Sequence, residues 1–328
     1  MNPLDLSAVN CEQLIKENPI DLIVSKRILF SPLNWGYGHL SRSIELLRKL
    51  RQNNNEVWVA CSPNFEHIYC QYFSDLNFVE HDDYPFDFSG SGNFSWELLR
   101  SSKSLYRRYC LEKEQVSELV ESLDIDYVLS DHRYGFRCNS VPSIFITHQI
   151  NLPVGKSGAP LQWLHKRLLR HFDKIWLVDD PEIKLSGKLT QTKMQNTAFI
   201  GVLSRFIASK VAPQKPIHTV VLISGPEPYS EMFFKEQVEY WSSRKEQVSI
   251  VYSNSEYKTG DAGNLHFHLA TDWVRTDELI RTATKIVSRS GYSTLMDIHR
   301  LNVEAELYPT PGQKEQIYLA RRHKKSLD

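Results

Sequence analysis

The sequence lacks an excess of charge of either sign, because its 39 Lys and Arg residues equal its 39 Asp and Glu residues. Such a chain does not attract nucleic acid or an anionic membrane as a whole, so any phosphate or lipid contact has to come from a local site. Long apolar runs are also missing, and stretches such as Val220 to Ile223 are far too short to cross a bilayer. With 41% hydrophobic and 24% charged residues, the composition excludes disordered, collagen-like and coiled-coil proteins.

Two further absences bear on location. The N-terminal segment carries Asp5 and Glu12 where a signal peptide would carry Lys or Arg and then an apolar run, so we do not expect a secretion signal. The five cysteines are scattered and form no CxxC pair, which argues against a disulfide framework and against a zinc site. We therefore expect a cytoplasmic protein in a reducing compartment.

Short β-rich apolar runs alternate with helical segments along the chain, which is the pattern of βαβ units in parallel sheets. In the first half we expect strands at 27–31, 57–60, 78–80, 127–130, 143–147, 174–178 and 197–201, and helices at 40–52, 64–73, 96–123 and 161–172. In the second half we expect strands at 219–224, 248–252, 265–269, 285–288 and 303–308, and helices at 230–242, 276–282, 293–301 and 313–324.

A polar segment with two prolines, 206–216, separates the two series and is typical of a linker between domains. The length of 328 residues also fits about two domains. We therefore predict an α/β fold with two Rossmann-like, doubly wound domains, at 27–205 and 217–328, after an N-terminal extension at 1–26.

The first predicted strand is followed by a glycine-rich loop that leads into a helix. Asn34, Gly36 and Gly38 lie in this loop, where backbone N–H groups can approach an anion, although a tight turn explains the glycines equally well. The loop lacks GxGxxG spacing and the lysine of a P-loop. His39 begins the helix, where the helix dipole favours a neutral imidazole that accepts a proton; the alternative is a histidine that caps the helix.

Polar residues also follow other predicted strands. Asp131 and His148 follow two strands of the first half, and Ser224 with Gly225 follows the first strand of the second half. Because ligands bind beyond the carboxyl ends of parallel strands, we expect these residues to line a cleft between the domains. Asp131 and His148 are the second and third candidates for a catalytic base, after His39.

The segment SRSGYST follows another strand and opens a helix. It combines hydroxyls, an unhindered backbone and a positive helix end, which together suit a phosphate group, in Ser290, Gly291, Ser293 and Thr294. Ordinary N-capping by a serine is the alternative. Asp297 lies one turn further and is placed to accept hydrogen bonds from ribose hydroxyls, unless it is a solvated helix charge.

The segment TPGQKEQ ends one strand and starts the next helix. Gln313 and Gln316 are placed to present amides to sugar hydroxyls, whereas Glu315 is expected only to favour the helix start. No pattern predicts a metal site, because the DxD of Asp124 and Asp126 precedes a strand instead of following one. The basic tail at 321–325 is either a solvated helix end or a contact to phospholipid headgroups.

Taken together, these motifs resemble a known family over residues 27 to 324. The segments SRSGYSTLMDI and TPGQKEQIYLA resemble the C-terminal domain of glycosyltransferases of the MurG type, which transfer N-acetylglucosamine. The segments NWGYGHLSR, SDHRYGF, FITHQINL and IGVLSRF are similar to uncharacterised predicted glycosyltransferases of bacteria. The resemblance implies a GT-B fold, with two Rossmann-like domains and an active site in the cleft between them.

The resemblance also implies roles for the motifs. The donor would be a nucleotide sugar, commonly UDP-linked, bound mainly to the C-terminal domain, with no catalytic metal and no further cofactor. Gly36, Gly38 and His39 correspond to the acceptor-side loop with a candidate base. The SRSGYST loop corresponds to the diphosphate loop, Asp297 to a ribose-binding carboxylate, and Gln313 and Gln316 to the donor-sugar segment.

The chain departs from this family in two places. The strand before TPGQ is normally apolar, but here it contains Glu304 and Glu306, and carboxylates in a central strand are costly to bury. Family members also usually continue beyond the equivalent of Gln316 with a helix that packs back across the domains. These departures leave open a weakened or specialised enzyme.

Three functions follow from the sequence. The first is transfer of a sugar, for example an N-acetylhexosamine, from a nucleotide-sugar donor to an acceptor hydroxyl. The second is hydrolysis of the nucleotide sugar, and the third is a non-catalytic subunit that binds sugar nucleotides. A lipid-linked acceptor would predict an apolar patch and a peripheral membrane contact, at Leu98, Leu99, Leu105 and Tyr106 or at Leu161, Trp163 and Leu164.

Overall fold

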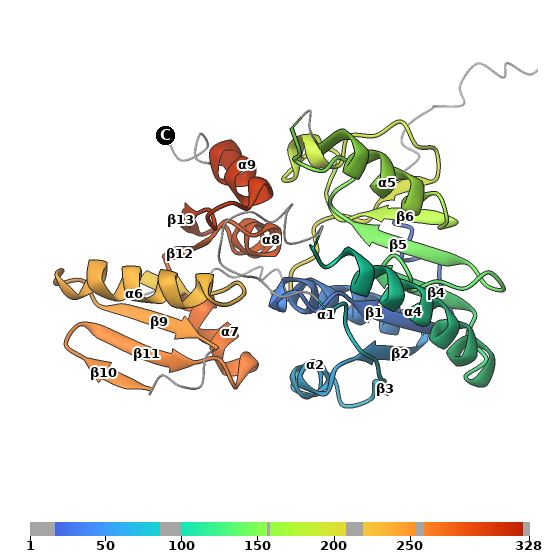
Figure 1. The fold of residues 1–328 in the computed structure, drawn as a ribbon. Helices are drawn as coiled ribbons and strands as arrows, with labels where there is room; N and C mark the ends of the chain where they lie inside the picture. The colour runs from blue at the N-terminus through green and yellow to red at the C-terminus, as the bar shows by residue number, and fades with distance from the viewer. Residues whose placement is uncertain (1–16, 86–99, 156–157, 208–218, 254–258, 324–328) are drawn as a thin grey trace, which may run out of the picture.

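Two separate sheets organise the chain (Figure 1). The computed structural model describes residues 17–85, 100–155, 158–207, 219–253 and 259–323. Residues 1–16 of the predicted extension, 208–216 of the predicted linker, the patch residues Leu98 and Leu99, and the end of the basic tail lie outside the described residues. No helix in the described ranges is long and apolar enough to cross a membrane.

The first sheet is entirely parallel and has the order β3-β2-β1-β4-β5-β6-β7. Its strands are β1 (Arg27–Pro32), β2 (Glu56–Cys61), β3 (Asn77–Glu80), β4 (Tyr127–Asp131), β5 (Ser143–Thr147), β6 (Lys174–Leu177) and β7 (Thr197–Phe199). The order reverses at β1, which pairs with β2 on one side and with β4 on the other. The loops that follow β1 and β4 therefore meet at a topological switch point, where ligands bind in sheets of this kind.

Helices connect these parallel strands: α1 (Tyr37–Gln52), α2 (Pro63–Tyr69), α4 (Ser102–Ser122), α5 (Ala159–Leu169) and a short 3-10 helix, Gly187–Leu189. Helix α1 buries Leu40, Ile44 and Leu47, which recur at the spacing of one helix face, against the sheet. The helix predicted at 64–73 ends early, at Tyr69. Ile20 and Ile23, from the segment before β1, are buried in the same core.

The second sheet has the order β10-β11-β9-β8-β12-β13, and only the β10–β11 pair is antiparallel. Its strands are β8 (Thr219–Leu222), β9 (Val248–Tyr252), β10 (Gly260–Ala262), β11 (Leu265–Leu269), β12 (Lys285–Arg289) and β13 (Glu304–Tyr308), and its helices are α6 (Tyr229–Ser242), α7 (Trp273–Thr282), α8 (Tyr292–Leu301) and α9 (Lys314–His323). The sequence analysis missed β10, a three-residue exposed strand with no apolar alternation.

The charged strand β13 is an edge strand, which corrects the expectation of a costly central one. Among the described strands it pairs only with β12. Glu304 is exposed, and the Glu306 carboxylate lies 2.9 Å from the ammonium of Lys285 and accepts a hydrogen bond from Tyr308. Neither carboxylate is therefore buried without a partner, and the strand gives no reason to expect a weakened fold.

One of the hydrophobic clusters contains residues of both halves. Tyr292, Leu295 and Met296 of α8 and Leu319 of α9 belong to the same buried cluster as the apolar face of α1. Helix α9 also docks on the first half, where Tyr318 Oη accepts from the backbone N–H of Lys188 at 2.8 Å. The helix predicted at 313–324 therefore itself packs against the first half.

Candidate active site

The N-termini of two helices meet where the halves join. Helix α1 begins after Gly36 and helix α8 after Gly291, and no side chain caps either helix. Ser293 Oγ donates to the carbonyl of Gly38 at 2.7 Å, so the predicted acceptor-side and diphosphate loops are in direct contact. Uncapped helix N-termini present free N–H groups and positive partial charge, and two of them side by side suit a diphosphate.

Gly36 is required by the backbone of this loop. Its φ of 112° lies in a region that residues with a Cβ rarely adopt. Asn34 anchors the loop to the rest of the first domain. Its backbone N–H donates to Asp83 at 3.2 Å, and its amide donates to Ser62 Oγ at 3.2 Å. In this structure Asn34 therefore holds the loop on the first domain.

His39 lies beside a buried ion pair. Its Nδ1 is 3.1 Å from Asp131 Oδ2, and its side chain is 18% exposed. Arg42 binds Asp131 with Nε and Nη2 and is 2% exposed. Burial lowers the pKa of His39, and the opposing charge of Asp131 does not offset this fully, so the neutral imidazole dominates at pH 7.

Asp131 is held as a carboxylate and does not fit a base. Burial alone would raise the pKa of its carboxyl, but Arg42 and His39 outweigh burial and hold that pKa well below its ordinary range. Within the described residues, these contacts make Asp131 an orienting partner of His39.

His148 has both ring nitrogens engaged. Its Nδ1 lies 3.0 Å from Arg42 Nη1, and its Nε2 lies 2.7 Å from Glu315 Oε1 in α9. Its ring also stacks on Tyr292, with centroids 4.3 Å apart and planes 4° apart. Of the three predicted bases, only His39 therefore keeps a ring nitrogen, Nε2, without a partner among the described residues. We call His39, Arg42, Asp131, His148 and Glu315 the buried network.

The SRSGYST segment, called the donor loop below, has some of its hydroxyls already engaged in hydrogen bonds. Ser290 is buried, and its Oγ donates to the carbonyl of Gln316 at 2.8 Å. Thr294, in the first turn of α8, is half-buried and is the hydroxyl of this loop that makes no hydrogen bond within the described part of the chain. Ser224 and Gly225 follow β8, which neighbours β12, so they lie at the same edge of the sheet as the donor loop.

Asp297 lies where the two domains meet, against Ser204 and Arg205, and not beside the uncapped N-terminus of α8. It is 8% exposed, its Oδ1 accepts from Ser204 Oγ at 2.6 Å, and its Oδ2 accepts from Arg205 Nη1 at 2.9 Å. A ribose would have to displace these partners. The spacing that suggested a ribose contact says nothing about a partner from the other domain, which is why the sequence did not reveal it.

Gln313 and Gln316 bind each other at the start of α9. Gln316 Nε2 donates to Gln313 Oε1 at 2.7 Å, and Gln316 Oε1 accepts from the backbone N–H of Thr310 at 2.9 Å. This orders the TPGQKEQ segment. Glu315, between them, does more than start the helix, since it binds His148.

The sequence analysis gave no site role to Arg42, His132, Glu315 or Tyr292. All four stand in motifs that were singled out, but nothing in the spacing of those motifs indicates partners far along the chain. His132 has a φ of 62°, and its ring centroid lies 5.1 Å from that of His39 and 5.4 Å from that of His148. Burial lowers its pKa well below the ordinary value.

The DxD pair of Asp124 and Asp126 and a second acidic pair, Asp179 and Asp180, lie among backbone groups that they help to hold in place. Asp126 accepts from the backbone N–H of Arg27 at 2.8 Å, and Asp179 accepts from the N–H groups of Leu185 and Ser186, both at 2.9 Å. In the described ranges, no group of three or more His, Cys, Asp or Glu side chains is arranged to hold a metal ion.

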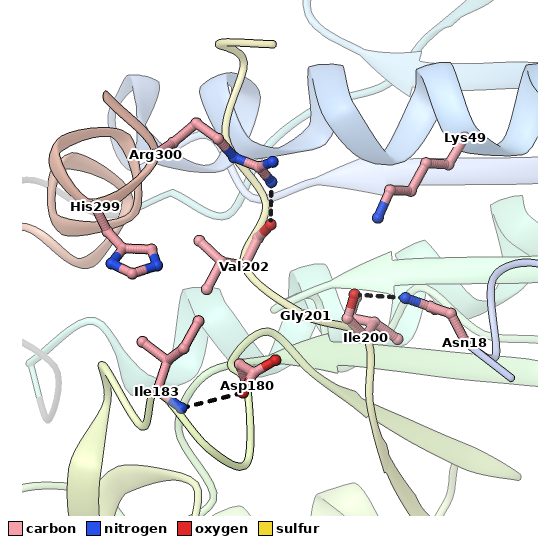
Figure 2. Close-up of a pocket in the computed structure, with 9 residues that line it drawn as sticks. All are labelled: Asn18, Lys49, Asp180, Ile183, Ile200, Gly201, Val202, His299 and Arg300. Atoms are coloured by element: carbon pink, nitrogen blue, oxygen red, sulfur yellow. Dashed lines mark hydrogen bonds between the residues drawn. The ribbon is translucent and has the colours of Figure 1, made fainter. Parts of the chain in front are cut away.

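A cavity of about 380 Å³ lies elsewhere along the seam (Figure 2). Lys49 of α1 and Arg300 of α8 extend toward each other over it, and Arg300 donates to the carbonyl of Val202 at 3.1 Å. Asp180 also lines it and accepts from the backbone N–H of Ile183 at 3.1 Å. The predicted site residues do not contribute to its lining.

Comparison with solved structures identifies the fold as GT-B. The glycotransferase of kitacinnamycin superimposes with a TM-score of 0.64 at 15% identity, over 92% of this chain and 85% of that chain. The spinosyn rhamnosyltransferase SpnG, in complex with thymidine diphosphate, gives 0.58 at 14% identity over 92% and 84%. MnaA of S. aureus with UDP gives 0.53 at 12% identity over 92% and 88%. No family model and no curated protein matches the sequence.

Proposed function

We propose that this protein is a glycosyltransferase that moves a sugar from a nucleotide-sugar donor to an acceptor hydroxyl. One observation carries the proposal: two uncapped helix N-termini meet beside a histidine that is paired with a buried carboxylate. The first feature suits a diphosphate leaving group and the second suits a proton acceptor. Similar folds that hold thymidine diphosphate or UDP support a nucleotide donor.

The donor diphosphate is assigned to the first turn of α8. Backbone N–H groups after Gly291 and the hydroxyl of Thr294 would donate to its oxygens, and the dipoles of α8 and α1 would stabilise the charge that develops as it leaves. This role requires no metal. The MurG-like motifs favour UDP as the nucleotide and an N-acetylhexosamine as the sugar, with Gln313 and Gln316 on the sugar side.

The base is assigned to His39. In the proposed reaction its Nε2 takes the proton of the acceptor hydroxyl, the oxygen forms a bond to the anomeric carbon, and the bond from that carbon to the diphosphate oxygen breaks. The nucleoside diphosphate leaves with the electron pair. Asp131 accepts from Nδ1–H of His39 and stabilises the imidazolium as it forms, while the carboxylate itself stays ionised.

A lipid-linked acceptor at the cytoplasmic face of a membrane is supported by helix α5. Trp163 is 63% exposed and Leu164 is 45% exposed, so neither is a core residue, and the guanidinium of Arg167 lies 5.4 Å from the Trp163 ring centroid. Aromatic, aliphatic and basic side chains together are typical of helices that lie on a membrane surface. A Trp163→Ser variant should then bind vesicles of anionic phospholipid more weakly than the wild-type protein does. Equal binding by the two would remove this part of the proposal.

Turnover of UDP-linked and TDP-linked sugars, with and without a panel of acceptors, tests the proposed function. We expect nucleoside diphosphate release that depends on an acceptor and falls about 100- to 10,000-fold in His39→Asn, which keeps the size of the side chain but loses its basicity. His67→Asn, at an exposed site on α2, is the matched control and should keep full activity. Free sugar without an acceptor would indicate a hydrolase, and binding without turnover would indicate a non-catalytic subunit. Failure to bind either nucleotide would contradict the proposal.

A further inference from the structure

Arg42 connects the second domain to His39. It lies on α1 one turn after His39, and its donors point to three partners. Nε and Nη2 donate to Asp131, Nη1 donates to Nδ1 of His148 at 3.0 Å, and Nη2 also lies 2.9 Å from Nδ1 of His39. Since a guanidinium has donors only, Nδ1 of His148 has to be the acceptor in this contact.

The position of the proton on His148 follows from this contact. A neutral imidazole that accepts at Nδ1 carries its proton on Nε2, and that N–H donates to Glu315 Oε1 at 2.7 Å. The amide of Gln149 also approaches Nε2, but at the longer distance of 3.3 Å and without a charge. The second domain therefore holds His148 twice, through Glu315 of α9 and through the stacked ring of Tyr292.

The neutral imidazole of His39 has two tautomers, and each one makes a different hydrogen bond at Nδ1. Its Nδ1 lies 3.1 Å from Asp131 Oδ2 and 2.9 Å from Arg42 Nη2. If Nδ1 carries the proton, it donates to Asp131, and Nε2 is free to accept a proton. If Arg42 donates to Nδ1, the proton sits on Nε2, and His39 is not a base. The groups that face His39 are Arg42 from α1, Asp131 at the end of β4, His132 directly after it, and His148 from the segment after β5.

We infer that Glu315 and His148 are positioning residues that hold the proton of His39 on Nδ1 by keeping Arg42 occupied. Without Glu315, His148 loses the acceptor for its Nε2–H and can place its proton on Nδ1, where it no longer accepts from Arg42. The Nη1 donor of the buried guanidinium then needs another acceptor, because an unsatisfied buried donor is costly. A shift of the guanidinium can supply one at Nδ1 of His39, which already lies 2.9 Å from Nη2 of the same group. Contact between the domains thereby makes His39 a base.

Ring-nitrogen NMR of histidine, which reports the tautomer of each imidazole, tests this without any substrate. In the wild-type protein we expect the proton on Nδ1 of His39 and on Nε2 of His148. In Glu315→Ala we expect His39 to shift toward the Nε2–H form. Glu315→Gln should restore the wild-type tautomers, because its side-chain oxygen still accepts from His148. Glu118→Ala, at an exposed site on α4, is the control and should change neither ring.

The kinetic consequence rests on the proposed function, whereas the NMR result does not. If the protein turns over a nucleotide sugar, Glu315→Ala should lower kcat at least tenfold with a smaller effect on the KM of the donor, and Glu315→Gln should recover most of kcat. Unchanged His39 tautomers in Glu315→Ala, or a proton on Nδ1 of His148 in the wild-type protein, would overturn the inference. Absence of turnover together with the expected tautomers would contradict only the proposed function.

Discussion

Arg205 pairs with two buried carboxylates where the two domains meet. Replacing it with methionine should lower the free energy of unfolding by about 3–5 kcal/mol. Arg205 Nε lies 2.5 Å from Asp277 Oδ1, and Nη1 lies 2.9 Å from Asp297 Oδ2. The side chains are 11%, 8% and 11% exposed, so the substitution leaves two buried carboxylates without their cation. The hydroxyls of Tyr72 and Ser204 remain as partners but carry no charge, so they offset only part of the cost.

The destabilisation caused by Arg205→Met should become smaller as the pH falls. Burial raises the folded-state pKa of Asp297 above the value in the unfolded chain, and Arg205 opposes this shift, so its removal raises that pKa further. The destabilisation is then complete above the folded-state pKa and shrinks as the pH falls toward the unfolded value, because protonated carboxyls are cheaper to bury. The difference between variant and wild type should therefore be smaller at pH 5 than at pH 7.

Urea unfolding followed by tryptophan fluorescence at the two pH values measures this effect. Methionine keeps most of the apolar packing of Arg205 against Trp273 and Phe206. Arg281→Met is the matched control, because Arg281 also lies over the Phe206 ring but has no carboxylate partner among the described residues. Equal midpoint shifts for the two variants, or a difference that does not shrink at pH 5, would refute the reasoning.

Three further predictions concern the first domain. Gly36→Ala should cost about 1–2 kcal/mol of folding stability in a urea titration, because Gly36 has a φ of 112°; an unchanged midpoint would contradict this. Gly135→Ala should lower the free energy of unfolding by about 1–3 kcal/mol in the same assay, since its Cβ would lie 2.6 Å from Glu112 Oε2; an unchanged midpoint would contradict this. Stability should fall as the pH drops below about 6.5, by up to about 1.4 kcal/mol per pH unit for each histidine whose folded-state pKa is lowered by burial. Burial lowers the pKa of His39 and brings that of His165 to about 4, so the unfolded chain is protonated first; equal midpoints at pH 7.5 and 5.5 would contradict this.

Much of the fold was predictable because it depends on local patterns. Strands β5, β9 and β11 have the bounds that their apolar runs predict. The same alternation predicts that the loops after parallel strands lie at one edge of each sheet, although it does not say which strands flank the switch point. His39 and the SRSGYST loop were singled out as candidates for this reason.

What the sequence did not reveal depends on contacts between distant segments. Whether a strand such as β13 is central or at an edge is decided by its neighbours, not by its own residues. Asp297 and Glu315 occupy ordinary helix positions, and only the packing of the two domains gives them their partners, at Arg205 and at His148. Arg42 binds Asp131 across 89 positions of the chain, a separation that no periodicity reports.

Binding of UDP to a Thr294→Asp variant is the most direct test of the central claim, that a nucleotide diphosphate binds at the N-terminus of α8. Thr294 is the third residue of the helix, where a carboxylate interacts favourably with the helix dipole, so the variant should fold at least as stably as the wild-type protein. The same carboxylate would repel a diphosphate, whereas Thr294→Asn is a neutral control of the same size. Calorimetry should show UDP binding to the wild type and to Thr294→Asn, and binding at least tenfold weaker to Thr294→Asp. Equal affinity for all three proteins, or no binding to the wild type, would contradict the account.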